Sequence, residues 1–244
     1  MALPAPATDK GSTSDMVKTD ETVPGSGEHA RSAERRLVIL YAPPATRRAL
    51  QSLFALDDTL AAILRTTREP LVGQMRLTWW YEALGRLDSA TAPAEPVLTA
   101  LQSHVLPAGV SGAMLAGMTD GWEALLEPVL DAAAVERFAR DRGRRLFEMA
   151  GTMLSVSDDR IGLAGEGWAL ADLSQRLTDA PSRTLSRTRA VEALDAALRG
   201  RWPGRARALG AMALSARFDV SASPLAPGSP KRVGRLAWHR LTGY

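Results

Sequence analysis

The stretch RLVILYAPPATRRALQSLFALDDTLAAIL, residues 36–64, decides the fold class of this chain. Its large apolar residues recur at intervals of three and four, at Leu50, Leu53, Phe54, Leu60 and Leu64. This spacing predicts an amphipathic helix over residues 47–64. The Pro-Pro pair at residues 43–44 fixes where that helix starts, because proline is tolerated only near a helix N-terminus.

The rest of the chain also has helical spacing. Comparable patterns, separated by Pro, Gly, Ser or Asp, predict helices over residues 71–87, 96–105, 111–126, 132–154, 165–177, 187–199, 205–218 and 232–244. The segment 71–87 has apolar residues on more than one face, so we expect it to be buried on several sides. Strand-like alternation is absent. The sequence therefore predicts an all-α fold, a single-domain bundle of about eight helices.

Residues 1–30 differ from the remainder in composition. They are rich in Pro, Gly, Ser, Thr and Asp, and they contain hardly any large apolar residue. Such a segment cannot bury enough apolar surface to offset the entropy lost on ordering. We predict a disordered tail over residues 1–30 and one helical domain over residues 31–244.

The composition argues against several kinds of site. There is no cysteine, and His29, His104 and His239 lie far apart in the sequence, so a zinc site is not expected. No apolar run approaches the ~18 to 20 residues that span a bilayer, and the N-terminus lacks the order of a secretory signal. We expect a soluble, cytoplasmic protein, in which any metal would be Mg²⁺ on carboxylates.

Positive charge is concentrated near the C-terminus. Residues 183–244 hold 12 basic and three acidic side chains, a net charge of +9, whereas residues 31–182 hold 16 basic and 19 acidic, a net charge of −3. A basic segment suits an anionic partner, although a solvated basic face or an arginine-rich genome would give the same composition. No nucleic-acid-binding motif accompanies it, so no nucleic-acid partner is predicted.

The last predicted helix mixes apolar and basic residues. Tryptophan at headgroup depth with arginines at the phosphates is typical of a helix that lies on an anionic bilayer. The candidates for such a surface, which would attach the protein to the inner face of the membrane, are Arg232, Arg235, Trp238 and Arg240. The alternative is that Leu236, Trp238 and Leu241 close the core while the arginines stay in water.

Three stretches, in order along the chain, resemble one protein family. Residues 36–64 are similar to the opening of the squalene/phytoene synthase family, whose first helix reads roughly Leu-Tyr-Ala-Phe-Cys-Arg-x-x-Asp-Asp-x-x-Asp. GQMRLTWWYEAL, residues 73–84, and LAWHRLTGY, residues 236–244, resemble signatures of a divergent, phytoene-synthase-like branch. That branch includes the mitochondrial respiratory complex I assembly factor and its bacterial relatives. The resemblance covers most of residues 35–244 and implies an isoprenoid-synthase-like fold.

The resemblance also implies a reaction, the Mg²⁺-dependent joining of two prenyl diphosphates head to head. The metal ions of such a site need carboxylates one helical turn apart. When residues 53–56 are placed on the family's Leu-Tyr-Ala-Phe, its three aspartates fall on Ala61, Ala62 and Arg65. The visible Asp57 and Asp58 are then out of register, and the first motif is incomplete.

The second carboxylate pair is missing as well. Asp172 is followed four residues later by Arg176, and Asp179 is followed by Arg183. We therefore predict no metal site and no cofactor, assign no catalytic residue, and expect a pseudoenzyme that binds an isoprenoid or lipid or serves in respiratory-complex assembly. The alternative is an active Mg²⁺-dependent prenyltransferase, because a four-residue shift of the alignment would restore one acid.

The residues expected around a pocket belong to three predicted helices. They are Asp57, Asp58, Arg65, Arg76, Trp79, Trp80, Asp172 and Arg176. Asp57 lies on an apolar helix face and needs a cation, for which Arg65 and Arg76 are the expected sources; a polar ligand site and an Mg²⁺ site are the alternatives. Trp79 and Trp80 either line a tunnel for an isoprenoid chain or pack in the core. We expect the run RDRGRR, residues 140–145, to be a solvated face.

Overall fold

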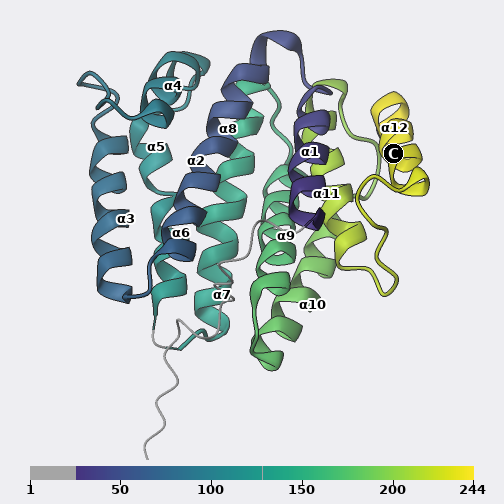
Figure 1. The fold of residues 1–244 in the computed structure, drawn as a ribbon. Coiled ribbons are helices and arrows are strands. Elements are labelled where there is room, and N and C mark those ends of the chain that lie inside the picture. The colour runs from purple at the N-terminus through teal and green to yellow at the C-terminus, as the bar shows by residue number, and fades with distance from the viewer. Residues whose placement is uncertain (1–25, 128) are drawn as a thin grey trace, which may run out of the picture.

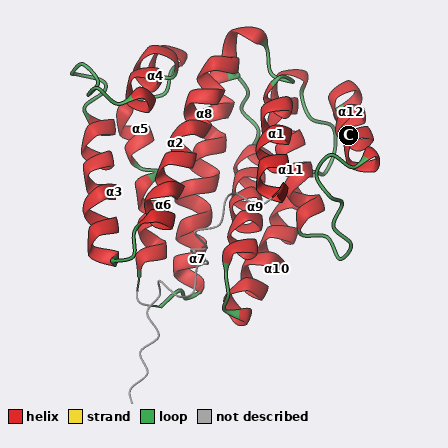
Figure 2. Ribbon diagram, in the orientation of Figure 1, coloured by secondary structure: helices red, strands yellow, loops and turns green. Residues whose placement is uncertain are grey.

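The computed structural model describes residues 26–127 and 129–244, and this part of the chain is helical throughout, without a strand (Figures 1 and 2). The predicted all-α fold is confirmed. The helices are α1 (Ser26–Ile39), α2 (Arg47–Thr66), α3 (Pro70–Gly85), α4 (Pro96–His104), α5 (Gly112–Ala116), α6 (Thr119–Glu123), α7 (Ala132–Phe138), α8 (Arg145–Met153), α9 (Asp159–Arg176), α10 (Ala180–Ala197), α11 (Arg207–Asp219) and α12 (Pro230–Thr242).

The described part of the chain has more helices than the eight or so that were expected, because two of the predicted helices are interrupted. The predicted helix 111–126 is divided at residues 117–118, and the predicted helix 132–154 is interrupted by a π-helical turn, Ala139–Arg144. The predicted boundary of the tail is also wrong, because α1 already begins at Ser26. Residues 1–25 of that tail lie outside the described residues. Within the described part of the chain, no helix is long and apolar enough to cross a bilayer.

Helix α2 follows the apolar spacing from which it was predicted. Leu50, Leu53, Leu56 and Leu60 are completely buried, in the core that α2 shares with α4 and α8. A short 3₁₀ turn, Pro44–Thr46, leads into the helix. The guanidinium of Arg47 donates hydrogen bonds to the carbonyl oxygens of Ala42 and Leu40, which ties the preceding loop to the helix start.

Helix α9 is central and touches the π-helical turn backbone to backbone. A Cβ on Gly143 would lie 2.2 Å from the carbonyl oxygen of Gly165, and a Cβ on Gly165 would lie 2.1 Å from that of Gly143. Any side chain larger than hydrogen would therefore push the two segments apart. This close crossing sets the position of Arg142, which adjoins Gly143, relative to residues on α9.

Helix α3 lies at one edge of the bundle (Figure 1). The expectation that it is buried on several sides is wrong. Leu77, Trp80 and Leu84 are buried on the side that faces α5 and α6. Leu71 and Met75, on the opposite side, are 68% and 66% exposed.

Helix α12 packs on α11. It buries Arg232, Leu236 and His239, and its end is fixed by a hydrogen bond of 2.8 Å from the backbone N–H of Trp202 to the carbonyl oxygen of Gly243. Gly243 has φ of +86°, a left-handed conformation that favours glycine at a helix C-terminus.

Candidate functional site

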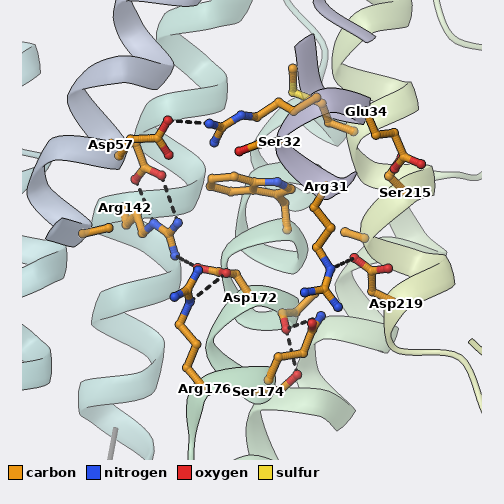
Figure 3. A pocket seen from close by; sticks show the side chains of 18 of the residues that line it. Arg31, Ser32, Glu34, Asp57, Arg142, Asp172, Ser174, Arg176, Ser215 and Asp219 are labelled. Carbon is orange, nitrogen blue, oxygen red and sulfur yellow. Dashed lines mark hydrogen bonds and ion pairs between the residues drawn. The ribbon is translucent and has the colours of Figure 1, made fainter. Parts of the chain in front are cut away.

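A cavity of about 930 Å³ is lined by residues of α1, α2, the π-helical turn, α9, α10, α11 and α12, and it is strongly charged (Figure 3). Five acids contribute to its wall: Glu34, Asp57, Asp58, Asp172 and Asp219. Seven arginines do so as well: Arg31, Arg35, Arg65, Arg142, Arg176, Arg183 and Arg232. The wall therefore carries a small excess of positive charge, and its chemistry depends on how these groups are paired.

Arg142 is the centre of the first ion-pair network. Its Nε donates to Asp57 Oδ1 at 2.8 Å and its Nη2 to Asp57 Oδ2 at 2.9 Å. Its third nitrogen, Nη1, donates to Asp172 Oδ2 at 2.8 Å. The guanidinium therefore lies between two carboxylates from two different helices and bonds to both (Figure 3).

Aromatic rings enclose the same guanidinium. Its carbon lies 4.3 Å from the centroid of the Trp122 ring and 4.7 Å from that of Trp168. Stacking on aromatic faces suits the planar, weakly hydrated guanidinium better than it would suit a lysine ammonium. The side chain of Arg142 is only 4% exposed, so its charge depends on these contacts and on the two carboxylates for its stability.

The electrostatics keep this network ionised. Burial alone raises the pKa of Asp172, but attraction to Arg176 and Arg142 outweighs it and holds that pKa well below its usual value. Burial likewise lowers the pKa of Arg142, but Asp57 and Asp172 raise it further. Arg176 donates from Nε to Asp172 Oδ1 at 3.0 Å, so Asp172 is bound by two cations.

A second network surrounds Arg232. Its Nε and Nη2 donate to the two carboxylate oxygens of Glu34 at 2.8 and 2.7 Å, and its Nη1 donates to Asp219 Oδ1 at 2.6 Å. Burial lowers the pKa of Arg232, and these two acids more than compensate. Since this side chain is 1% exposed, the expectation that Arg232 belongs to an outer anionic surface is wrong.

Two cavity arginines are not neutralised in this way. Arg65, near the end of α2, and Arg183, in the first turn of α10, are exposed at the cavity wall. Among the residues that the structure describes, neither has a carboxylate within ion-pair distance. Arg35, by contrast, is paired with Asp58. Arg65 and Arg183 are therefore the cavity cations best able to bind an external anion.

The cavity brings together five of the eight predicted pocket residues: Asp57, Asp58, Arg65, Asp172 and Arg176. The other three lie elsewhere. Arg76 donates to the hydroxyls of Thr66 and Thr67, and Trp79 and Trp80 form an edge-to-face pair, with ring centroids 5.4 Å apart, on α3. Neither tryptophan lines this cavity, so the predicted tunnel of Trp79 and Trp80 is not part of it.

Sequence reasoning missed the cation that Asp57 binds. Neither Arg65 nor Arg76 fills that role, which falls to Arg142. The expectation of a solvated face over residues 140–145 is also wrong at its centre, because Asp141 and Arg142 are buried. The glycine next to Arg142 was an available signal, since a glycine inside a helix often marks a close approach of two backbones.

Two further expectations concern residues outside this network. Asp179, considered for the second metal motif, is the N-cap of α10 and accepts a hydrogen bond of 2.8 Å from the backbone N–H of Ser182. On α12, Arg235, Trp238 and Arg240 are exposed, as the surface hypothesis requires. Only Leu236 of the three apolar residues in the core-closing alternative is buried.

The carboxylates do not fit a Mg²⁺ cluster. Within the described residues there is no group of three or more acidic, histidine or cysteine side chains that could hold a metal ion. Asp57 and Asp172 both face the guanidinium of Arg142, which supplies positive charge where a divalent ion would have to bind. What this arrangement can do chemically is bind an anion through arginine hydrogen bonds.

Comparison with known proteins gives one match. Residues 29–180 match the sequence model of the squalene/phytoene synthase family, which is more than half of the chain. The matched range includes α2 with Asp57, the π-helical turn with Arg142, and α9 with Asp172. No curated protein and no solved structure matched the chain.

Proposed function

Because the chain belongs to the squalene/phytoene synthase family, we propose that it binds an isoprenoid or lipid with an anionic head group and does not join two prenyl diphosphates. The observation that carries this proposal is the guanidinium of Arg142 between Asp57 and Asp172. In the family's reaction, Mg²⁺ on aspartates neutralises the leaving diphosphate. Here alanine and arginine stand at the positions of the first aspartate motif, and the nearby carboxylates of Asp57 and Asp172 are paired with the guanidinium of Arg142.

The exposed arginines supply the binding chemistry. An arginine binds a phosphate or carboxylate through two parallel hydrogen bonds and needs no metal. Arg65 and Arg183 lie at the cavity wall, where they can take this role. In the alignment of the first motif, Arg65 occupies the position of one of the family's aspartates. The volume of about 930 Å³ is within the range of small-molecule sites. Apolar side chains on the same wall, Val38, Trp168, Leu177 and Met212, would contact the first part of a tail.

Membership in the divergent branch of the family is a finer part of the same proposal. GQMRLTWWYEAL and LAWHRLTGY support it, as does the lack of both metal motifs. A role in assembling a respiratory complex would follow from this placement. Such a role is compatible with a bound lipid, and it requires no catalysis by this chain.

Attachment to an anionic membrane is a second proposal, supported by the outer face of α12. Val233, Trp238 and Leu241 are 51%, 54% and 73% exposed, and the nearby Arg235 and Arg240 are exposed as well. Apolar side chains beside cations are the composition of an interfacial helix. Such a position would bring the protein to the source of a lipid ligand.

Calorimetric titration with farnesyl diphosphate tests the binding proposal. We expect binding of similar affinity in EDTA and in Mg²⁺, because arginines replace the metal. Arg65→Gln and Arg183→Gln should each weaken it about tenfold, the effect of a charge-assisted hydrogen bond. Arg86→Gln is the control and should change nothing, because Arg86 is exposed, follows directly after α3 and lies outside the cavity.

A pyrophosphate-release assay with the same substrate tests the loss of catalysis. We expect no release from farnesyl or geranylgeranyl diphosphate with Mg²⁺. Binding that requires Mg²⁺, or turnover that Asp58→Ala abolishes, would contradict the proposal and favour an active prenyltransferase.

A further inference from the structure

Helix α1 forms one wall of the charged cavity. Five of its residues line that cavity, and their helical spacing places them on one face of α1: Arg31, Ser32, Glu34, Arg35 and Val38. The helix lies between α2 and α11 and contacts both (Figure 1). Since α2 and α11 also line the cavity, α1 bridges two of its sides, and any motion of α1 changes access to it.

Charges attach most of this helix to the rest of the molecule. Among the described residues, three ion pairs do so, each to a different helix: Arg35 to Asp58 on α2, Arg31 to Asp219 on α11 at 3.6 Å, and Glu34 to Arg232 on α12 at 2.7 Å. The guanidinium of Arg35 also lies 5.6 Å from the centroid of the Phe54 ring. Arg31 and Asp58 are 47% and 54% exposed, so dissolved salt screens their two pairs.

Apolar packing holds only the end of α1. Val38 and Ile39, in its last turn, are 1% and 2% exposed. Of residues 29–37, whose side chains the structure describes, Glu34 alone is buried, and Leu37 is 61% exposed. The helix has 14 residues, a length at which an isolated helix is marginal in water. The turns before Val38 therefore depend on the ion pairs for their position, whereas the last turn is fixed by the core.

We propose that residues 26–37 are a lid on the cavity, held closed by these ion pairs and anchored at Val38 and Ile39. When the pairs break, the segment detaches and loses its helical structure, and the cavity opens between α2 and α11. Segments with few buried apolar contacts are the ones that open locally in native proteins. As the entry route of an isoprenoid or lipid, the lid rests on the proposed function. Its motion does not, because the attachments of α1 are those of the chain without a ligand.

Hydrogen exchange of the ligand-free full chain measures the opening. We expect the backbone amides of residues 29–37 to exchange faster than those of α9. Their exchange should accelerate about tenfold between about 0.1 and 1 M NaCl, because the Debye length falls from about 10 to about 3 Å. Exchange in α9, which is packed in the core, should not respond to salt.

A matched pair of variants tests the role of the ion pairs. Asp58→Asn removes the partner of Arg35 and should accelerate exchange of residues 29–37 about threefold at low salt, the effect of one partly exposed ion pair. Asp195→Asn is the control, because it breaks the pair between Asp195 on α10 and Arg217 on α11, which does not involve α1. It should leave exchange in α1 unchanged.

Thiol labelling tests whether the same motion opens the cavity. The chain contains no cysteine, so one introduced thiol reports on one position. Ser215 lines the cavity (Figure 3), and its hydroxyl is buried. We expect the thiol of Ser215→Cys to react with iodoacetamide, an uncharged reagent, about tenfold faster in 1 M than in 0.1 M NaCl, in step with exchange of α1. Ser186→Cys is the control, because Ser186 is completely buried on α10 and does not line the cavity; its rate should not depend on salt.

Circular dichroism verifies that each variant is helical, and if Asp58→Asn fails to fold, the salt series on the unaltered chain decides. Three results would each overturn the proposal: exchange of residues 29–37 that does not respond to salt, an effect of Asp58→Asn no larger than that of Asp195→Asn, or a Ser215→Cys thiol that does not follow the exchange. Because no ligand is used, failure to bind farnesyl diphosphate would contradict the proposed function and leave the lid in place. An α1 that stays closed would remove the lid alone.

Discussion

Arg142 and Asp57, 85 residues apart in the sequence, form a two-bond ion pair with N···O distances of 2.8 and 2.9 Å. Their side chains are 4% and 1% exposed. Two charges so far from water are stable only when each is fully bonded, and Asp172 completes the bonding of Arg142. The aspartate that first suggests a metal site is therefore part of a network that holds α2, the π-helical turn and α9 together.

Removing the central cation should destabilise the fold. Arg142→Met removes the cation that binds Asp57 and one of the two that bind Asp172, so we expect a loss of about 3 to 5 kcal/mol in the free energy of unfolding. Urea denaturation measures it. Arg48→Met is the control, because Arg48 is exposed on α2, and it should cost less than about 1 kcal/mol. Equal losses for the two variants would contradict the structural role of Arg142.

The protein should become less stable as the pH falls, because of His239. This side chain lies on the buried face of α12, and neither of its ring nitrogens has a hydrogen-bond partner among the described residues. Burial lowers its pKa, and nearby backbone groups only partly offset this. The unfolded chain therefore takes up the proton at a higher pH than the folded chain. Stability should be complete above the unfolded value of about 6.5 and should decline as the pH falls through it toward the lower folded value.

Thermal unfolding at pH 7.5 and 5.5, followed by circular dichroism, measures this effect. His239→Gln cannot take up the proton, so its melting temperature should change less between the two pH values than that of the unaltered protein. His104→Gln is the control, because His104 is exposed, and it should retain the full pH dependence. A His239→Gln variant with unchanged pH dependence would assign the effect to other groups.

The crossing of Gly143 and Gly165 predicts a sharp difference between two glycine substitutions. Gly165→Ala puts a methyl group 2.1 Å from a backbone oxygen, and it should cost about 3 kcal/mol or more, since the backbones must separate. Gly234→Ala, in the middle of α12 with nothing within 4 Å, should instead stabilise by roughly 0.5 to 1 kcal/mol. Urea denaturation of both variants tests this. A neutral Gly165→Ala would mean that the two segments are not packed as described.

Co-sedimentation with vesicles tests the membrane proposal for α12. Three exposed cations, Lys231, Arg235 and Arg240, should contribute about 1 kcal/mol each near an anionic bilayer. We expect binding to phosphatidylglycerol vesicles at low salt, little binding at high salt, and none to phosphatidylcholine. Trp238→Ala should weaken it and Leu37→Ala should not. Equal binding to both lipids, or none at low salt, would count against this role.

The apolar spacing of the sequence was enough for the helical class and for the main helices, because burial of an amphipathic face dominates helix formation. It located α2 at Leu50, Leu53 and Leu60, and the order of the motifs pointed to the family. The same spacing did not predict where a helix would be interrupted. The division of residues 111–126 and the π-helical turn depend on packing between segments, which a helical period does not record.

The pairing of charges was decided by the tertiary structure alone. The sequence placed Asp57 on an apolar face and showed that its partners at i+4 are alanines, so it determined that the simple metal motif is incomplete. Which cation binds Asp57 depends on the crossing of Gly143 and Gly165, which brings a residue 85 positions away to 2.8 Å. Likewise, only the structure separates the buried Arg232 from the exposed Arg235, three residues later on the same helix. An ion pair depends on distances of a few ångströms between segments that are remote along the chain, and no spacing rule within one helix contains that information.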